Sequence, residues 1–353
     1  MKRISILLLL VFVLYLAGCA QPGTNAPSEP TQPTGVHIPS APIQPTEKPV
    51  EAMWYQNIKM STYADWSAPV VETDAHFYYI AENGLYQYSK ETKENSRVVA
   101  DTIYGLYLCD GNLYYHTCHK VERIDLRTMT TLTIWDESML PTDEDKNNYA
   151  YIEISDFAIQ DGYLYIAGTG ISVMRINLAN NTMEQFLIDC SDMVLFGNDC
   201  YYVDHAERTF SLYHMTCDTK EITLLRGEGY TEPELDKMRI DNIVGMDNMV
   251  AYSVRGTADI YLYQPNGSDE KIFYGDDGEQ VWLSFIKQRS AGKFYFYITD
   301  GSRLKLYEYQ PEIGANLLIS FDCTTRMCDV VVTETAVFWW SAEDAMTKCF
   351  VKV

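Results

Sequence analysis

The densest grouping of potential metal ligands in the sequence is His116-Thr117-Cys118-His119. Imidazole nitrogens and thiolates are ligands that zinc and copper prefer. On a β-strand, alternate side chains point to opposite faces, which separates His116 and Cys118 from His119. The spacing also differs from the Cys-x-x-Cys-His pattern of c-type haem attachment. We therefore expect no metal and no cofactor at this position.

Carboxylates could supply calcium ligands or an acid–base pair, and they cluster in two runs, 143–148 and 276–279. The first run lacks the glycine and the closing glutamate of an EF-hand loop, and both runs are interpreted as solvated loops. The sequence contains no Gly-x-Ser-x-Gly nucleophile elbow, no phosphate-binding loop and no His-Glu-x-x-His motif. No catalytic residue is assigned, and an enzymatic activity is the less favoured interpretation.

Aromatic side chains form a third group that could bind a ligand. Rings beside carboxylates hold sugars by stacking and cationic peptides by cation–π contact. The competing interpretation is that the same rings pack inside the fold. The candidates, all in segments that join predicted strands, are Trp66, Trp135, Tyr149, Tyr151, Tyr230 and Trp282.

Cys19 is the one thiol whose context predicts a covalent modification. A basic start, Met1-Lys2-Arg3, precedes an apolar run of about 13 residues, which is shorter than the roughly 20 that a membrane-spanning helix needs. The small residues Ala17 and Gly18 then lead to Cys19, as in the bacterial lipobox. We expect residues 1–18 to be a signal peptide and Cys19 to carry the lipid of an extracytoplasmic membrane anchor.

Residues 19–50 contain the lipidated cysteine and a segment rich in Pro, Thr and Ser, without a period of apolar residues. Such a segment buries too little surface to fold and is typical of an extended tether. The remaining residues, 51–353, have the composition of a globular domain, with 27 Tyr in the chain. A net charge of −22 argues against nucleic acid and against direct docking on anionic lipid, and it permits a cationic partner.

Eight cysteines remain besides Cys19, and outside the cytoplasm an even number permits disulfides. Buried thiols are an equally serious interpretation. Cys323 and Cys328 are near enough in sequence to staple a turn, and Cys200 and Cys217 could face each other across adjacent strands.

An internal repeat organises the domain. A short aromatic strand recurs seven times, at intervals of about 36 to 51 residues, beginning near residues 76, 112, 163, 200, 249, 294 and 337. A tight polar turn such as Asp110-Gly111 or Asp161-Gly162 precedes it, and an alternating strand such as Leu304–Tyr309 follows. This pattern predicts an all-β fold, a β-propeller of about seven four-stranded blades.

The seventh repeat supplies three strands, and the lone strand predicted over Met53–Met60 has no blade of its own. We expect this N-terminal strand to complete the last blade. In propellers, connections from an outer strand to the next inner strand lie at one end of the ring, where ligands usually bind. The two longest such connections are 135–155 and 227–241, and all six aromatic candidates belong to this class.

The aromatic strands, the turns and the Leu-Tyr-x-Tyr strands resemble bacterial lipoproteins with a domain of unknown function, DUF5050, that is similar to the propeller of low-density-lipoprotein-receptor-related proteins. The resemblance covers nearly all of residues 51–353. It implies a propeller, with a blade number that varies among relatives so that six or eight remain open, and no defined chemistry. We expect a lipid-anchored module that binds or scaffolds a glycan, a peptide or an envelope protein. The alternative is an extracytoplasmic glycan hydrolase or lyase with an acidic pair at the mouth.

Overall fold

The computed structural model describes fifteen segments of the chain: 52–56, 68–81, 84–139, 154–168, 173–187, 190–204, 210–227, 240–254, 257–264, 266–274, 282–290, 292–299, 303–322, 328–341 and 346–351. The chain divides into two compact units, Met1–Ala41 and Pro42–Val353, and every described residue belongs to the second. Cys19, the predicted signal peptide and the predicted tether lie outside the described residues. No helix in the described part of the chain has the length and apolarity of a membrane span.

The described strands form seven four-stranded antiparallel sheets, which confirms the predicted propeller. Blade 1 contains β2 (Val70–Glu72), β3 (His76–Ala81), β4 (Gly84–Ser89) and β5 (Asn95–Val99). Blade 2 contains β6 (Gly105–Cys109), β7 (Asn112–His116), β8 (Lys120–Asp125) and β9 (Thr130–Asp136), followed by the 3-10 helix η1 (Glu137–Met139). Blade 3 contains β10 (Ile154–Gln160), β11 (Tyr163–Gly168), β12 (Val173–Asn177) and β13 (Met183–Leu187).

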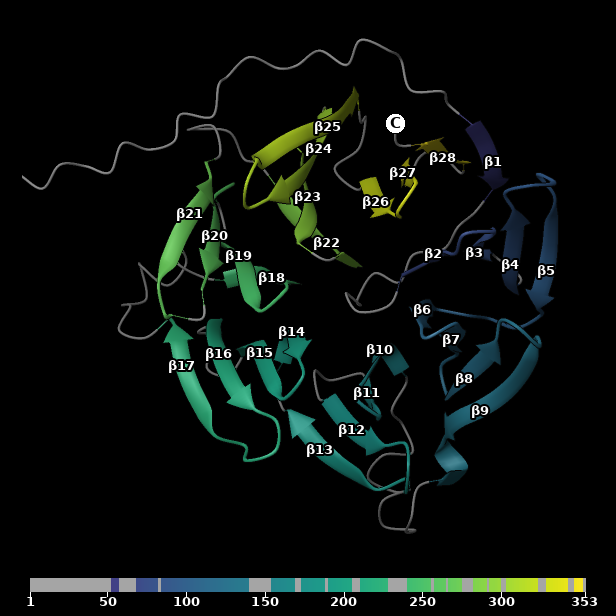
Figure 1. Ribbon diagram of the computed structural model, residues 1–353, viewed down its shortest axis with the longest axis horizontal. Coiled ribbons are helices and arrows are strands. Elements are labelled where there is room, and N and C mark those ends of the chain that lie inside the picture. The colour runs from purple at the N-terminus through teal and green to yellow at the C-terminus, as the bar shows by residue number, and fades with distance from the viewer. Residues whose placement is uncertain are drawn as a thin grey trace, which may run out of the picture. The chain divides into compact units, whose positions relative to one another are not determined.

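The remaining blades repeat this order. Blade 4 contains β14 (Cys190–Phe196), β15 (Asp199–Asp204), β16 (Ser211–Thr216) and β17 (Ile222–Arg226). Blade 5 contains β18 (Ile240–Met246), β19 (Met249–Val254), β20 (Ile260–Tyr263) and β21 (Asp269–Phe273). Blade 6 contains β22 (Trp282–Ser290), β23 (Lys293–Thr299), β24 (Arg303–Gln310) and β25 (Gly314–Asp322). Blade 7 contains β26 (Cys328–Val332), β27 (Ala336–Ser341), β28 (Met346–Val351) and β1 (Ala52–Gln56). Figure 1 shows the first strand of each blade innermost and the fourth outermost.

The repeated aromatic strand is the second strand of each blade, and it faces two neighbours at once. In β3, Phe77 and Tyr79 pack against Phe338 of blade 7, whereas Tyr78 and Ile80 pack with blade 2. This follows from the two-residue period of a strand. Seven apolar clusters of this kind lie among the described residues, one at each junction between consecutive blades and one between blades 7 and 1. Each sheet is apolar on both faces, and closing the sheets into a ring buries both faces of every sheet.

The N-terminal strand completes the last blade, as predicted. β1 pairs antiparallel with β28, with Ala52 opposite Cys349 and Gln56 opposite Met346. The observed strand covers Ala52–Gln56, the first part of the predicted Met53–Met60. Blade 7 is therefore built from both ends of the propeller sequence.

A second ring closure involves Glu72 at the end of β2. Its carboxylate accepts hydrogen bonds from the Thr335 backbone amide at 2.9 Å and from the Thr335 hydroxyl, and it pairs with Lys90. Burial alone raises the pKa of Glu72, but the hydrogen bonds from Lys90, Thr333 and Thr335 lower it more, so the pKa lies below its usual value. Glu72 thus links blade 1 to the turn between β26 and β27 as an ionised group.

The turns between the third and fourth strands of blades 1 to 4 share one backbone conformation. The residue in the same position of each turn has a positive φ, and these residues are Lys93, Met129, Asn181 and Lys220. The amide of Met129 donates to the Asp125 carbonyl at 2.7 Å, and the equivalent bond recurs in the other three turns. Three of the four residues are long side chains in a backbone region that favours Gly and Asn.

Replacing Met129 by glycine is therefore expected to stabilise the propeller by about 0.5–1 kcal/mol, because the left-handed conformation strains a residue with a Cβ. Met129 is 45% exposed, so its side chain contributes little packing. Urea unfolding at pH 7 measures the change. Arg127→Gly is the matched control, since Arg127 lies in the same turn at negative φ, and it should destabilise. A Met129→Gly protein no more stable than the parent would contradict the strain argument.

Candidate functional site

The two ends of the ring differ in the connections that they carry. Turns from the first to the second strand and from the third to the fourth strand lie at one end, called here the hairpin end. Connections from the second to the third strand and from the fourth strand to the next blade belong to the opposite end, called here the insertion end. Segments 140–153 and 227–239 join η1 to β10 and β17 to β18, so both long connections start and finish at the insertion end.

The predicted aromatic candidates divide into three groups. Trp66, Tyr149, Tyr151 and Tyr230 lie outside the described residues. Trp282 is the first residue of β22, opposite Thr299, and its side chain is not described. Trp135 is 5% exposed and packs between blades 2 and 3 with Val121 and Phe157. Packing inside the fold, the competing interpretation, is therefore correct for Trp135, and it is withdrawn as a ligand-binding residue.

An exposed aromatic platform lies on blade 5 at the insertion end. Tyr274 follows the last residue of β21 and is 57% exposed. The Lys271 ammonium lies 4.5 Å from the centre of the Tyr274 ring and forms an ion pair with Asp259 at 2.6 Å. We call these three residues the blade 5 platform. Trp282 begins the strand that follows the same connection, so its backbone lies at the same end.

Electrostatics keep the platform's cation in place. Burial alone lowers the pKa of Lys271, but the hydrogen bond and the charge of Asp259 raise it more, so the pKa lies above its usual value. The lysine is therefore charged at neutral pH, and its ammonium already occupies the cation–π position over Tyr274. The Tyr274 side chain is more than half exposed, with a cation and a carboxylate beside it to donate and accept hydrogen bonds.

Among the described residues, Tyr104 is a second exposed tyrosine of this end, at 38% exposure. It precedes β6, and its ring lies 6.0 Å from the His116 ring at the end of β7. Blades 2 and 5 are three blades apart, so Tyr104 and Tyr274 do not hold the same small ligand. Neither residue is among the candidates predicted from the sequence, although both lie in connections that follow an outer strand, as those candidates do.

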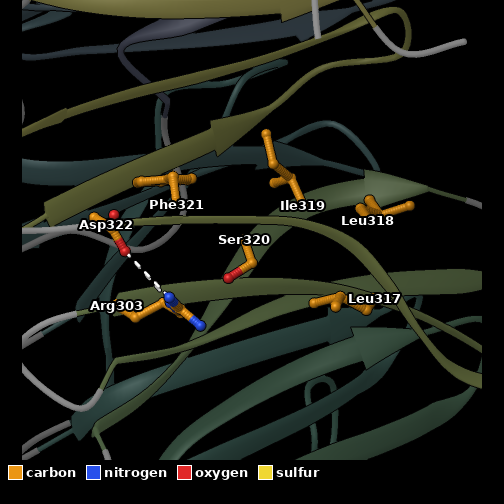
Figure 2. A pocket seen from close by; sticks show the side chains of 7 residues that line it. All are labelled: Arg303, Leu317, Leu318, Ile319, Ser320, Phe321 and Asp322. Carbon is orange, nitrogen blue, oxygen red and sulfur yellow. Dashed lines mark hydrogen bonds and ion pairs between the residues drawn. The ribbon is translucent and has the colours of Figure 1, made fainter. Parts of the chain in front are cut away.

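The groove drawn in Figure 2 lies on blade 6 and has a volume of about 350 Å³. Five consecutive residues of β25, Leu317–Phe321, line it, and the Arg303–Asp322 ion pair at 3.4 Å closes one end. Because β25 is the outer strand, the groove runs along the edge of the sheet. Its lining is mostly apolar and lacks the converging polar groups of a small-molecule site. We assign it no ligand.

Buried carboxylates lie at the starts of two inner strands. Asp156 in β10 and Asp192 in β14 are 2% and 4% exposed and follow β-bulges at equivalent positions. The Asp192 carboxylate accepts the Ile243 amide of blade 5 at 2.8 Å, and the Asp156 carboxylate accepts the Phe157 amide at 2.7 Å. These contacts fix inner strands in place and give both carboxylates a structural role.

Tyrosine hydroxyls of the repeated aromatic strands find partners within their own blade. Tyr115 donates to Glu122 at 2.6 Å and Tyr79 donates to Asn95 at 3.0 Å. Burial raises the pKa of both hydroxyls, so they stay protonated. Tyr115 and Tyr79 therefore pack between blades while their hydroxyls are satisfied within the blade.

Cys118, Cys200 and Cys217 are free thiols. Cys200 lies opposite Met215, two residues before Cys217, which places the two cysteines diagonally on one face of adjacent strands, as predicted. Burial raises the pKa of Cys200 well above its usual value and that of Cys217 to about 11. Both are neutral packing groups at pH 7. Cys323 lies outside the described residues, and the side chains of Cys328 and Cys349 are not described.

The structure separates the two histidines of the His116–His119 motif. His116 is fully buried at the end of β7, whereas His119 lies in the following turn and is exposed. Among the described residues, no three His, Cys, Asp or Glu side chains lie where they could hold a metal ion. The imidazole of His116 contacts the Thr117 carbonyl through Nδ1 at 3.2 Å and packs against Phe157 at 5.4 Å.

No family model matches the sequence, and no curated protein matches it. Several solved structures are similar to the chain. The chain resembles the β-propeller domain of Cps50 (Swd1) from Myceliophteria thermophila with a TM-score of 0.54 at 9% identity, over 86% of this chain and 100% of that one. It resembles virginiamycin B lyase from Staphylococcus aureus with a TM-score of 0.52 at 9% identity, over 86% and 99%.

A third similar structure is the extracellular domain of the one-component system BT4673 from B. thetaiotaomicron. Its TM-score is 0.54 at 11% identity, over 84% of this chain and 40% of that one. Identities this low show a common fold and carry no activity from one protein to another. The chain is a β-propeller, a fold that serves generally as a binding or scaffolding module.

Proposed function

We propose that this protein is a lipid-anchored, extracytoplasmic propeller that binds a glycan at its insertion end. The blade 5 platform carries the proposal. A sugar presents an apolar ring face that stacks on an exposed tyrosine and hydroxyls that need donors and acceptors at the edge. Tyr274, Lys271 and Asp259 supply these three features within one blade. A cationic peptide fits less well, because Lys271 already lies over the ring.

Binding of the soluble domain, residues 51–353, to immobilised glycans tests the proposal. Tyr274→Ala should weaken binding about tenfold, since an aromatic contact contributes roughly 0.5–1.5 kcal/mol beyond its buried area. Tyr274→Phe should keep the stacking and most of the affinity. Tyr104→Ala, three blades away, is the control and should leave binding unchanged. A glycan that binds the Tyr274→Ala variant with unchanged affinity would show that the platform is not the site.

The anchor has its own test, because the lipobox pattern at Cys19 supports it independently of the propeller. Cys19→Ala should remove labelled palmitate from the protein and move it from the membrane fraction to the soluble fraction. Two acyl chains give stable attachment. A protein with Cys19 intact that takes up no labelled palmitate would rule out the lipid.

A further inference from the structure

The direction of β1 decides at which end of the ring the N-terminal segment joins the propeller. β27 runs from the hairpin end to the insertion end, β28 returns, and β1 runs antiparallel to β28. Ala52 lies opposite Cys349, near the end of β28, and Gln56 lies opposite Met346, at its start. The chain therefore enters the ring at the hairpin end and reaches the insertion end only after β1.

The hairpin end is strongly acidic. Within the described turns of this end, ten carboxylate side chains are exposed, against two exposed cations, Lys93 and Arg127. The carboxylates are distributed over all seven blades and comprise Asp74, Glu91, Glu94, Asp110, Asp161, Asp218, Glu221, Asp247, Glu312 and Glu334. Two further cations in these turns, Lys90 and Lys220, are half-buried, and each lies beside a glutamate. An anionic bilayer repels such a face within a Debye length of about 10 Å at 0.1 M salt.

We infer that the hairpin end faces the membrane without lying on it, and that the insertion end points away from the bilayer. This inference rests on the proposed anchor at Cys19. A random chain with as many residues as the predicted tether would have a mean span of roughly 30 Å. The ring is about 20 Å deep, since its strands of mostly five to seven residues rise about 3.3 Å per residue. The point of attachment therefore places the hairpin end nearer the anchor, and the acidic charge keeps that end off an anionic bilayer. This arrangement presents the blade 5 platform to a glycan beyond the membrane surface.

Energy transfer to a labelled lipid measures the orientation. A clickable donor is placed at Thr92 or Thr219, both at the hairpin end, or at Ser138 or Thr257, both at the insertion end. The chain is attached to nickel-chelating vesicles by a polyhistidine tag that replaces residues 1–19. We expect both hairpin-end donors to transfer more efficiently than both insertion-end donors, by an amount that corresponds to about 20 Å. Equal efficiencies, or the reverse order, would overturn the inference.

Lipid charge provides the second readout. On vesicles with anionic lipid at low salt, transfer from Thr92 should fall relative to neutral vesicles, because the acidic face is repelled. The combined variant Glu91→Lys, Glu94→Lys, Glu221→Lys and Glu312→Lys should reverse this fall. If transfer from Thr92 does not depend on lipid charge, the electrostatic part of the inference is wrong. Because the tag replaces the natural lipid, failure of the Cys19 anchor appears only in the fractionation experiment and leaves this one interpretable.

Discussion

Deletion of residues 51–60 lowers the melting temperature of the propeller by roughly 10 °C. The deletion removes β1 and leaves blade 7 with three strands and an open edge on β28. The four residues that pair with β28 contribute about 1 kcal/mol each through their backbone hydrogen bonds. For a domain of this size, each kcal/mol changes the melting temperature by about 2–4 °C.

The ring does not fall apart without β1, because two other contacts join blades 7 and 1. These are the apolar cluster around Val70 and Phe338 and the hydrogen bonds from Thr335 to Glu72. The expected product is a folded but less stable propeller. A synthetic peptide of residues 51–60, added to the truncated protein, should raise the melting temperature with peptide concentration, because it binds only the folded ring.

Deletion of residues 20–49 is the matched control, since it shortens the chain on the same side and leaves β1 intact. Its melting temperature should equal that of the full domain. Scanning calorimetry of the three proteins compares them directly. If the 51–60 deletion melts at the same temperature as the control, then β1 contributes no stability and the pairing with β28 is dispensable.

The fold could be predicted from the sequence because the same requirement recurs in every blade. A strand such as Phe77–Ile80 carries apolar side chains on both faces. It can bury them only if another sheet packs on each face. Turn residues such as Asp110-Gly111 then set the strand boundaries, since both adopt positive φ. Counting strands was enough to assign β1 to blade 7.

The candidate site could not be predicted residue by residue, because exposure depends on where each outer strand ends. β9 continues to Asp136, so Trp135 still lies opposite the buried Val121 and faces the neighbouring blade. β21 ends at Phe273, so Tyr274 is already beyond the sheet and free of it. Single-residue differences in strand length are not encoded in the periodicity. The partnership of Lys271 with Asp259 across β20 and β21 is also invisible until the register is known.

Acidification from pH 6.5 to pH 4 destabilises the propeller through His116. This imidazole is fully buried between blades 2 and 3, against Phe157, and its Nε2 has no hydrogen-bond partner among the described residues. Burial lowers the pKa of His116 to about 4, although the Thr117 carbonyl partly opposes the shift. In the unfolded chain the pKa returns to about 6.5.

The direction of the change in stability with pH follows from which state binds the proton. Below pH 6.5 the unfolded chain protonates this histidine while the folded chain does not, so the free energy of unfolding decreases as the pH falls. The loss continues until the pH passes the folded pKa near 4 and then levels off. The difference of about 2.5 units corresponds to about 3 kcal/mol at most.

Urea unfolding of the unchanged protein and of His116→Phe between pH 7 and pH 4 isolates this contribution. Phenylalanine keeps a ring against Phe157 and cannot take up a proton, so the variant should lose stability less steeply on acidification. The pH dependence has to be compared between the two proteins, because carboxylates contribute to it as well. The folded pKa of Glu72 is lowered, so its contribution to stability is lost as the pH falls below about 4.5.

His119→Phe removes an exposed histidine three residues away and should keep the steep pH dependence of the unchanged protein. Equal slopes for the unchanged protein and His116→Phe would mean that the folded state accommodates the proton on His116. That result would require a hydrogen-bond acceptor or a water at Nε2. It would also remove the reason to expect that acid loosens the junction of blades 2 and 3, to which the segment 140–153 is attached.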